Sequence, residues 1–323
     1  GQAFARARGK TVQIAGDGQF GGLGFGNGGF LTMPGMLRVC PPRVNTLPRW
    51  SGTPVLCKAW RNASSKGVLM AAIIEKLSDS RAEAREWELR CDMAAVFRIG
   101  ARLGWNEHIG NHNSLMLPDE AEPRFLINPR GYLFQELKAS DLIVCDLEGH
   151  VLRGAGELRK VAFHIHTRIH LANPAATCVI HVHPRHLTAL SMVQGAEFAL
   201  SHHNNLLLND RTVYDDEGDQ PVHSNEEGDR IAQLMGDKTI MLMRGHGVTV
   251  VGPTVHDAFD ECYMAERTCM YQLTAMQTGQ PLHKLPDNLR RNHTGPWGEK
   301  LDARLHLNAW RRVLDREEPD YAR

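Results

Sequence analysis

Two histidines close a strand-like segment of the sequence, TCVIHVH at residues 177–183. The apolar run at 178–180 is typical of a buried strand, and His181 and His183 follow it at a spacing of two. Because side chains alternate between the two faces of a strand, we expect both imidazoles to point the same way. Imidazole nitrogens are common ligands of divalent metals such as zinc, so this pair predicts part of a metal site.

A third histidine, His246, lies between two glycines in the segment RGHG at 244–247, after a second strand-like run at 239–243. Glycine on both sides lets the backbone approach closely and turn sharply at a strand end. Three histidine ligands leave one coordination position open, which is typical of catalytic zinc sites. A metal ion held there would polarise a substrate oxygen and stabilise a neighbouring carbanion or enolate. The alternative is that His181 and His183 belong to an ordinary half-buried strand.

Apolar periodicity and turn residues predict the elements that position these histidines. Helices are expected over about 80–103, 160–172, 184–193, 226–235 and 254–278. Strands are expected over about 115–117, 124–128, 142–146, 178–180, 239–243 and 248–251, and residues 109–114 are expected to form a loop before the first of them. Neighbouring strands are expected to pair antiparallel, with a hairpin turn at 148–150. A mixed sheet with helices before, between and after its strands argues for an α+β fold or an α/β fold built as a three-layer α/β/α sandwich.

The overall composition restricts the possible partners. With 37 basic and 37 acidic residues the formal net charge is zero, which gives no electrostatic case for a nucleic acid partner. No apolar run approaches the roughly 20 residues of a membrane span, so no membrane partner is expected. Cys91, Cys145 and Cys178 lie among apolar residues and form no CxxC pair, which favours a reducing, cytoplasmic compartment. These exclusions leave a small-molecule substrate, or further copies of the same chain, as possible partners.

The first 69 residues differ from the rest, with nine basic residues, one acid (Asp17) and 13 of the 30 glycines. We expect residues 1–75 to form a basic, glycine-rich extension that is mostly disordered. Organelle targeting is one alternative, and upstream sequence preceding a start at Met70 is another. A single domain is expected over 80–285, followed by a helical tail over 286–323.

Several motifs, in their order along the chain, resemble those of the class II aldolase and adducin family. They are NHNS at 111–114, FLINPRG at 125–131, LIVCDLEGHVL at 142–152, CVIHVHPRHLTALS at 178–191 and RGHGVTVVGPTVHDAFD at 244–260. The resemblance implies a three-layer α/β/α sandwich with a mainly antiparallel central sheet, and a homotetramer with sites at subunit interfaces. It also implies that His181, His183 and His246 hold a divalent metal, zinc first, with iron or manganese as alternatives.

The sequence departs from the sugar-phosphate aldolases of that family at two places. Those enzymes carry a glutamate acid/base nineteen residues before the first histidine of the HxH pair, where this chain has Ala162. Their phosphate-binding turn is replaced here by the segment 128–131, in which Arg130 is suited to grip a carboxylate with two hydrogen bonds. We therefore predict that Arg130, Gly131 and Asn111 contact the substrate, and that Asn111 also orders its own loop.

The catalytic acid must then come from another residue. His166 and His112 are the predicted catalytic residues, because His166 lies on the inner face of the helix over 160–172 and His112 follows a turn. Tyr263 is a further candidate that is more simply explained by packing. Phe163, His166 and Ile169 match a pattern of the adducin-like branch of the family, which also includes aromatic-acid decarboxylases.

Two functions follow from the resemblance. The first is a divalent-metal-dependent lyase, of the aldolase or decarboxylase type, acting on a small carboxylated or hydroxylated carbonyl compound or aromatic acid. The second is a non-catalytic, adducin-like interaction or scaffold domain that retains a metal site. Iron-based oxidative chemistry at three histidines is a third possibility.

Overall fold

The computed structural model describes residues 55–118, 122–217, 224–286, 288–289 and 303–323. The chain divides into two compact units, Gly1–Asn62 and Ala63–Arg323. Of the first unit, the described residues 55–62 form the opening turns of a helix, and the sheet and the other described helices belong to the second unit.

One eight-stranded sheet forms the centre of this unit, in the order β4-β3-β2-β1-β5-β8-β7-β6. Every neighbouring pair is antiparallel except β6 and β7, which are parallel. The strands are β1 (His112–Met116), β2 (Arg124–Ile127), β3 (Ile143–Asp146), β4 (Val151–Arg153), β5 (Cys178–Val182), β6 (Thr212–Asp215), β7 (Ile240–Met243) and β8 (Val248–Gly252). The mainly antiparallel sheet that the sequence predicts is therefore confirmed.

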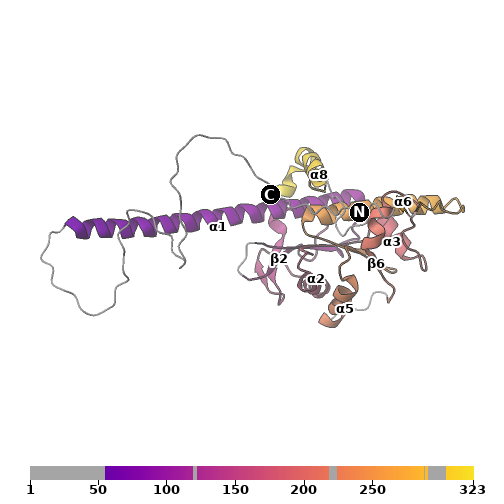
Figure 1. The fold of residues 1–323 in the computed structure, drawn as a ribbon, viewed down its shortest axis with the longest axis horizontal. Helices are drawn as coiled ribbons and strands as arrows, with labels where there is room; N and C mark the ends of the chain where they lie inside the picture. Colours follow the sequence, from indigo (N-terminus) through magenta and orange to yellow (C-terminus); the bar gives the residue numbers. More distant parts are fainter. Residues whose placement is uncertain (1–54, 119–121, 218–223, 287, 290–302) are drawn as a thin grey trace, which may run out of the picture. The chain divides into compact units, whose positions relative to one another are not determined.

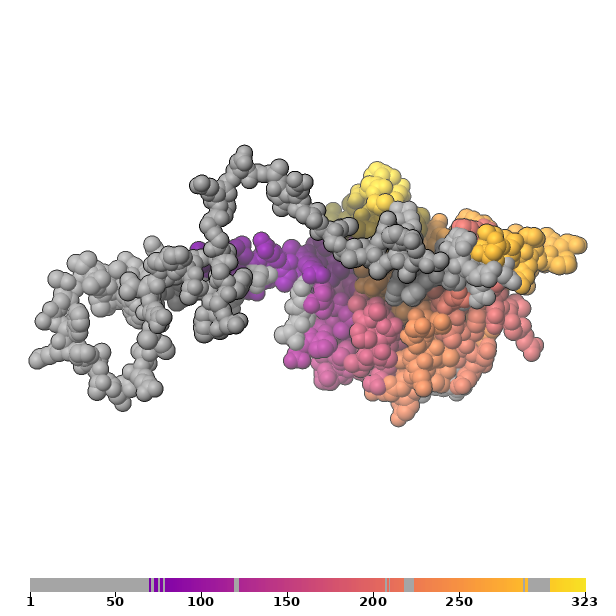
Figure 2. Space-filling view, in the orientation of Figure 1, coloured from indigo at the N-terminus to yellow at the C-terminus, as the bar shows by residue number. Residues whose placement is uncertain are grey.

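Helices cover both faces of the sheet, which makes the three-layer α/β/α sandwich expected from the sequence (Figure 1). One face carries α1 (Val55–Leu103), α3 (Arg185–Ser191) and α6 (Val255–Met276), and α8 (Ala303–Glu317) packs against α6. The other carries α2 (Lys160–Ala172) and α5 (Asn225–Met235), which pack against each other. The short helices α4 (Asn205–Leu208), η1 (Ala139–Asp141), η2 (Asn209–Arg211) and η3 (Pro319–Ala322) complete the described elements. In the space-filling view, the described residues coloured from magenta to orange form one continuous body (Figure 2).

The predicted helix boundaries agree with the structure where cap residues mark them. Thr254 caps α6, since its hydroxyl oxygen accepts a hydrogen bond from the Asp257 backbone N–H at 3.2 Å. Gly104, which follows α1, has a φ of +68°, the left-handed conformation that ends many helices. The apolar stripe of α6 is fully buried, as its helical spacing predicts, and consists of Ala258, Cys262, Ala265 and Cys269.

Three sequence predictions need correction. Helix α1 begins at Val55 and continues unbroken to Leu103, so residues 55–75 are helical and not disordered; residues 1–54 lie outside the described residues. The residues 112–114, expected in a loop, belong to β1, because they pair with β5. The tail is helical as predicted but is not separate from the domain expected to end at 285, since Leu307, Leu314 and Tyr321 are fully buried in the hydrophobic cluster that includes residues of α1 and α6.

No helix among the described segments combines the length and the apolar character that a bilayer span requires.

Candidate metal centre

Three histidines meet at one end of the sheet. His181 lies in β5, His183 follows this strand directly, and His246 lies in the turn between β7 and β8. Their possible ligand atoms all lie within 4.8 Å of one another. The centroids of the three rings are 5.2, 4.9 and 4.7 Å apart, pair by pair. The structure thus brings together the three residues that the sequence predicts as metal ligands.

The turn at His246 depends on its two glycines for different reasons. Gly245 has a φ of +67°, a conformation that residues with a side chain rarely adopt. Gly247 lies so close to His183 that an added Cβ atom would be 2.4 Å from the ring carbon Cδ2. Gly247 therefore gives His183 the space to lie beside His246.

Hydrogen bonds orient two of the three imidazoles. His181 Nδ1 lies 3.1 Å from Thr249 Oγ1, and the Thr249 hydroxyl donates in turn to the Met243 sulfur. The ring N–H of His183 at Nδ1 donates to Glu107 Oε2, 2.8 Å away. Both rings are therefore left with Nε2 as the nitrogen that presents a lone pair, which is the arrangement found in protein metal sites.

The donor set fits a divalent metal ion. His183 Nε2 is buried and has no hydrogen-bond partner among the described residues, which is costly unless another ligand occupies it. Burial lowers the pKa of His181 well below its ordinary value, so this ring is neutral, the form that binds metal. Three imidazoles suit zinc, and they suit iron or manganese as well.

Glu107 is held in place by the loop that precedes β1. Its backbone N–H donates to Asn111 Oδ1 at 2.6 Å, and the Asn111 carbonyl accepts from Asn128 Nδ2 at 3.2 Å. The hydrogen bond from His183 lowers the pKa of Glu107, which keeps the carboxylate charged. Asn111 thus orders its loop, as predicted, while its Nδ2 remains buried without a partner among the described residues.

The two predicted catalytic histidines lie next to this cluster. The ring of His112 stacks on that of His181, and its Nδ1 is 2.8 Å from His166 Nε2. Burial, followed by the positive charge of Arg159, lowers the pKa of His112 to about 3. His166 is fully buried and lies behind His112, as seen from the metal ligands. Of the two, His112 is therefore the one beside the three-histidine cluster.

Arg130 and Gly131 lie on the turn after β2. The side chain of Arg130 is 63% exposed, and its closest ion-pair partner is Glu157 at 3.8 Å. Gly131 has a φ of +96°, so this turn requires glycine. The backbone N–H of Arg130 also donates to the Glu157 carbonyl oxygen at 2.9 Å, and the substrate-binding role of Arg130 and Gly131 stays a prediction.

Sequence reasoning missed several residues of the site. Thr249 lies opposite His181 in the register of β5 and β8, and Ser114 lies two residues beyond His112 on the same face of β1. In a strand, residues two apart lie on the same face, so the spacing of His112 and Ser114 would have indicated their proximity had both been predicted in a strand. Glu107 and Arg159 carry no such signal, because loop geometry alone brings them to the histidines.

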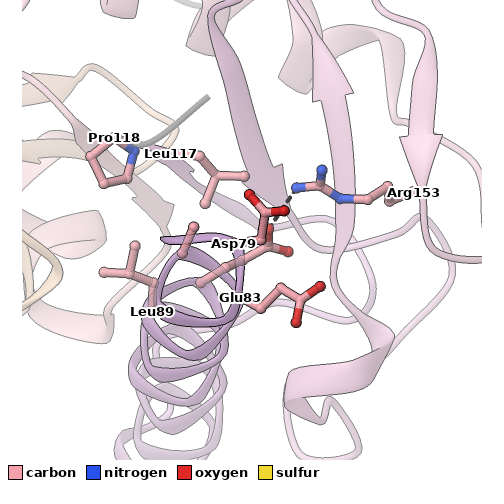
Figure 3. Close-up of a pocket in the computed structure, with 8 residues that line it drawn as sticks. Asp79, Glu83, Leu89, Leu117, Pro118 and Arg153 are labelled. Carbon is pink, nitrogen blue, oxygen red and sulfur yellow. Dashed lines mark hydrogen bonds and ion pairs between the residues drawn. The ribbon is translucent and has the colours of Figure 1, made fainter. Parts of the chain in front are cut away.

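A separate cavity of about 210 Å³ lies between α1, the segment Leu117–Pro118 that follows β1, and Arg153 of β4 (Figure 3). Arg153 reaches into it toward the acidic residues of α1 and forms an ion pair of 2.6 Å with Glu86. None of the predicted site residues lines this cavity, so it is distinct from the histidine cluster.

Comparison with known proteins agrees with the motifs. Residues 91–273 match the family model described as the Class II Aldolase and Adducin N-terminal domain. A protein of Caulobacter vibrioides, whose name places it among the class 2 aldolases, is 32% identical over 73% of this chain and 93% of its own length. Human beta-adducin is 30% identical over 61% of this chain, but only 27% of its own length is matched.

The fold has solved counterparts. The crystal structure of an aldolase II superfamily protein from Pseudomonas syringae superposes with a TM-score of 0.68 and is 28% identical. The superposition covers 74% of this chain and 96% of that protein.

Proposed function

Since the chain belongs to the class II aldolase and adducin family, we propose that it is a divalent-metal-dependent lyase. Its substrate would be a small carboxylated or hydroxylated carbonyl compound or an aromatic acid, cleaved at a carbon–carbon bond by aldol cleavage or decarboxylation. The metal is zinc in this proposal, with iron and manganese as alternatives. We further propose a homo-oligomer, a tetramer by family resemblance, and a cytoplasmic location.

One observation carries the proposal. His181, His183 and His246 converge at a sheet end, and Glu107 and Thr249 orient two of them so that Nε2 is presented. A structural zinc site is closed by four protein ligands, whereas three ligands leave a position for a substrate or water. A divalent ion at this position supplies Lewis-acid polarisation of a substrate oxygen.

The protein's own residues supply the proton transfer. His112 lies beside His181 and is the nearest imidazole that the ligand set does not use, so we propose it as the catalytic acid or base. His166 reaches the cluster only through His112, so we assign it a positioning role in place of the catalytic role predicted from the sequence.

A cation beside His112 is suited to bind a carboxylate. Arg159, at the start of α2, is close enough for its charge to lower the pKa of His112, and its guanidinium contacts the Ile109 carbonyl at 3.4 Å. We propose that Arg159 is the residue that binds the carboxylate of the substrate. Arg130, Gly131 and Asn111 remain proposed substrate contacts from the sequence.

One observation favours the second candidate, an adducin-like interaction domain. Ala162, which stands where the related aldolases carry their glutamate, is fully buried among apolar side chains. Its neighbours in this cluster are Phe125, Ile127, Ile143 and Cys145. Ala162 supplies no carboxylate at this position, which favours the interaction domain. Lyase chemistry would then depend on another group, for which we propose His112.

Metal content tests the proposal first. We expect the full-length protein to contain about one zinc, iron or manganese ion per chain, and His181→Ala and His246→Ala to lose it. His164→Ala is the matched control and should retain the metal, because the His164 ring is on α2 but hydrogen-bonds Asn225 of α5 and not the cluster. If the wild-type protein neither contains nor takes up metal, the lyase proposal fails.

A substrate screen then separates the two candidates. Keto acids and hydroxybenzoates are incubated with the metal-loaded protein, with and without a chelator. Chelator-sensitive cleavage that is lost in His112→Gln supports the lyase. Metal binding without turnover of any compound in either class favours the interaction domain.

A further inference from the structure

A polar layer is buried within the face of the sheet that α2 covers. In the strand register, Ser114 lies between Ile127 of β2 and Val179 of β5. These two residues belong to two separate apolar clusters on this face. The layer around Ser114, His166 and His170 is therefore apolar. Polar side chains buried in this way are stable only when each polar atom is hydrogen-bonded.

The polar side chains form one continuous row of hydrogen bonds. His170 Nδ1 lies 2.7 Å from the Ala176 carbonyl oxygen, and His170 Nε2 lies 2.8 Å from Ser114 Oγ. Ser114 Oγ is also 2.6 Å from His166 Nδ1, and His166 Nε2 is 2.8 Å from His112 Nδ1. The row ends beside the metal ligands, where His112 stacks on His181.

The Ala176 carbonyl sets the direction of every hydrogen bond in this row. A carbonyl oxygen only accepts, so His170 must carry its hydrogen on Nδ1. A neutral His170 then accepts at Nε2 from the Ser114 hydroxyl, which leaves Ser114 Oγ to accept from His166 Nδ1. A neutral His166 in turn accepts at Nε2, so the donor in the last bond is His112 Nδ1.

Both intermediate histidines are neutral at pH 7. Burial holds the pKa of His170 at about 4. Burial, together with the nearby imidazoles, keeps the pKa of His166 well below its ordinary value. Because His170 and His166 are neutral, the hydrogen-bond geometry places a hydrogen on His112 Nδ1. This holds whether His112 itself is neutral or protonated.

We propose that Ser114 and His170 are positioning residues which, through His166, fix the hydrogen of His112 on Nδ1 and leave Nε2 as its proton-exchanging atom. The two nitrogens flank Cε1 and their outward directions diverge widely, so Nε2 does not point toward His166 and the buried row. The catalytic part of this proposal rests on the proposed lyase function, whereas the position of the hydrogen does not.

The row is an orienting device and not a path for protons. A path would need a group at its far end that takes up or releases a proton near neutral pH, and the Ala176 carbonyl does neither. The row instead holds His112 in one tautomer and one orientation, in the way that a buried carboxylate holds a catalytic imidazole in other enzymes.

Nitrogen NMR of the full-length, histidine-labelled protein tests the tautomer directly. His112 and His170 are assigned from His112→Gln and His170→Gln, with and without one equivalent of zinc. We expect the hydrogen on Nδ1 for both residues. His202 is the internal reference for a hydrogen on Nε2, because its Nδ1 accepts from the Asn204 backbone N–H at 3.2 Å. A hydrogen on Nε2 of wild-type His112 overturns the proposal.

Ser114→Ala and Ser114→Thr test the role of the hydroxyl. The alanine variant should lose the exclusive Nδ1–H form of His112, and the threonine variant should restore it. If a substrate is found, kcat of Ser114→Ala should fall roughly 10- to 100-fold with little change in KM. An unchanged tautomer in folded Ser114→Ala removes Ser114 from the proposal. A complete lack of turnover, in contrast, contradicts the lyase function and leaves the tautomer result intact.

Discussion

The imidazole rings of His112 and His181 lie nearly parallel, with 4.9 Å between their centroids and 25° between their planes. This contact follows from the pairing of β1 with β5, in which the two residues are direct partners. Side chains opposite each other on antiparallel strands lie on the same face. A candidate metal ligand and a candidate acid/base are therefore placed side by side by backbone register.

Removal of the charge at Glu107 should weaken metal binding. Its carboxylate accepts the His183 Nδ1–H at 2.8 Å, which orients the ring and raises the basicity of Nε2. In Glu107→Gln we expect metal affinity to fall by about 10- to 100-fold, measured by competition with a chelator. Glu148→Gln, an exposed carboxylate far along the chain, is the control. Equal affinity for the two variants would show that Glu107 does not support the site.

The two glycines around His246 should respond differently to alanine. Gly247→Ala places a Cβ atom against His183, 2.4 Å from Cδ2, so the ring must move and metal binding should be lost. Gly245→Ala meets open space and suffers only from its φ of +67°, which costs about 1–2 kcal/mol of unfolding free energy. Metal stoichiometry and urea denaturation measure the two effects. Retention of metal by Gly247→Ala would contradict the assigned geometry.

Acid should destabilise the protein through its buried histidines. His170 titrates at about 4 in the folded protein, whereas the unfolded chain takes up the proton near pH 6.5. Between these values the unfolded state binds more protons, so the free energy of unfolding falls as the pH drops, by about 3 kcal/mol for this residue.

His170→Gln isolates this contribution, because the amide keeps hydrogen-bonding groups but does not titrate. Urea denaturation between pH 7 and pH 4 should show a smaller loss of stability in the variant than in the wild-type protein. Identical pH slopes would mean that His170 is protonated in the folded state, which would also contradict its place in the hydrogen-bonded row.

The C-terminal helix should contribute to the stability of the domain. Leu314 is fully buried in the core, whereas Leu305 on the same helix is 64% exposed. Leu314→Ala should lower the free energy of unfolding by about 2–5 kcal/mol, and Leu305→Ala should change it by less than about 0.5 kcal/mol. Equal, small effects in urea denaturation would show that α8 does not belong to the core.

The sequence by itself determined the features that depend on local periodicity. The alternation of a strand places His181 and His183 on one side, and the helical spacing of α2 places His166 and His170 on one face. The hydroxyl of Thr254 and the glycine after α1 mark helix ends for equally local reasons. Each of these depends on backbone geometry within a few residues.

The tertiary structure alone decided which distant residues meet. The register of β1 against β5 turned a predicted loop into a strand and brought His112 to His181. The loop before β1 supplies Glu107, and the packing of α2 on the sheet joins His166 to Ser114 while it buries Ala162 among apolar residues. These contacts arise from pairing and packing between segments far apart in the chain, for which local spacing holds no information.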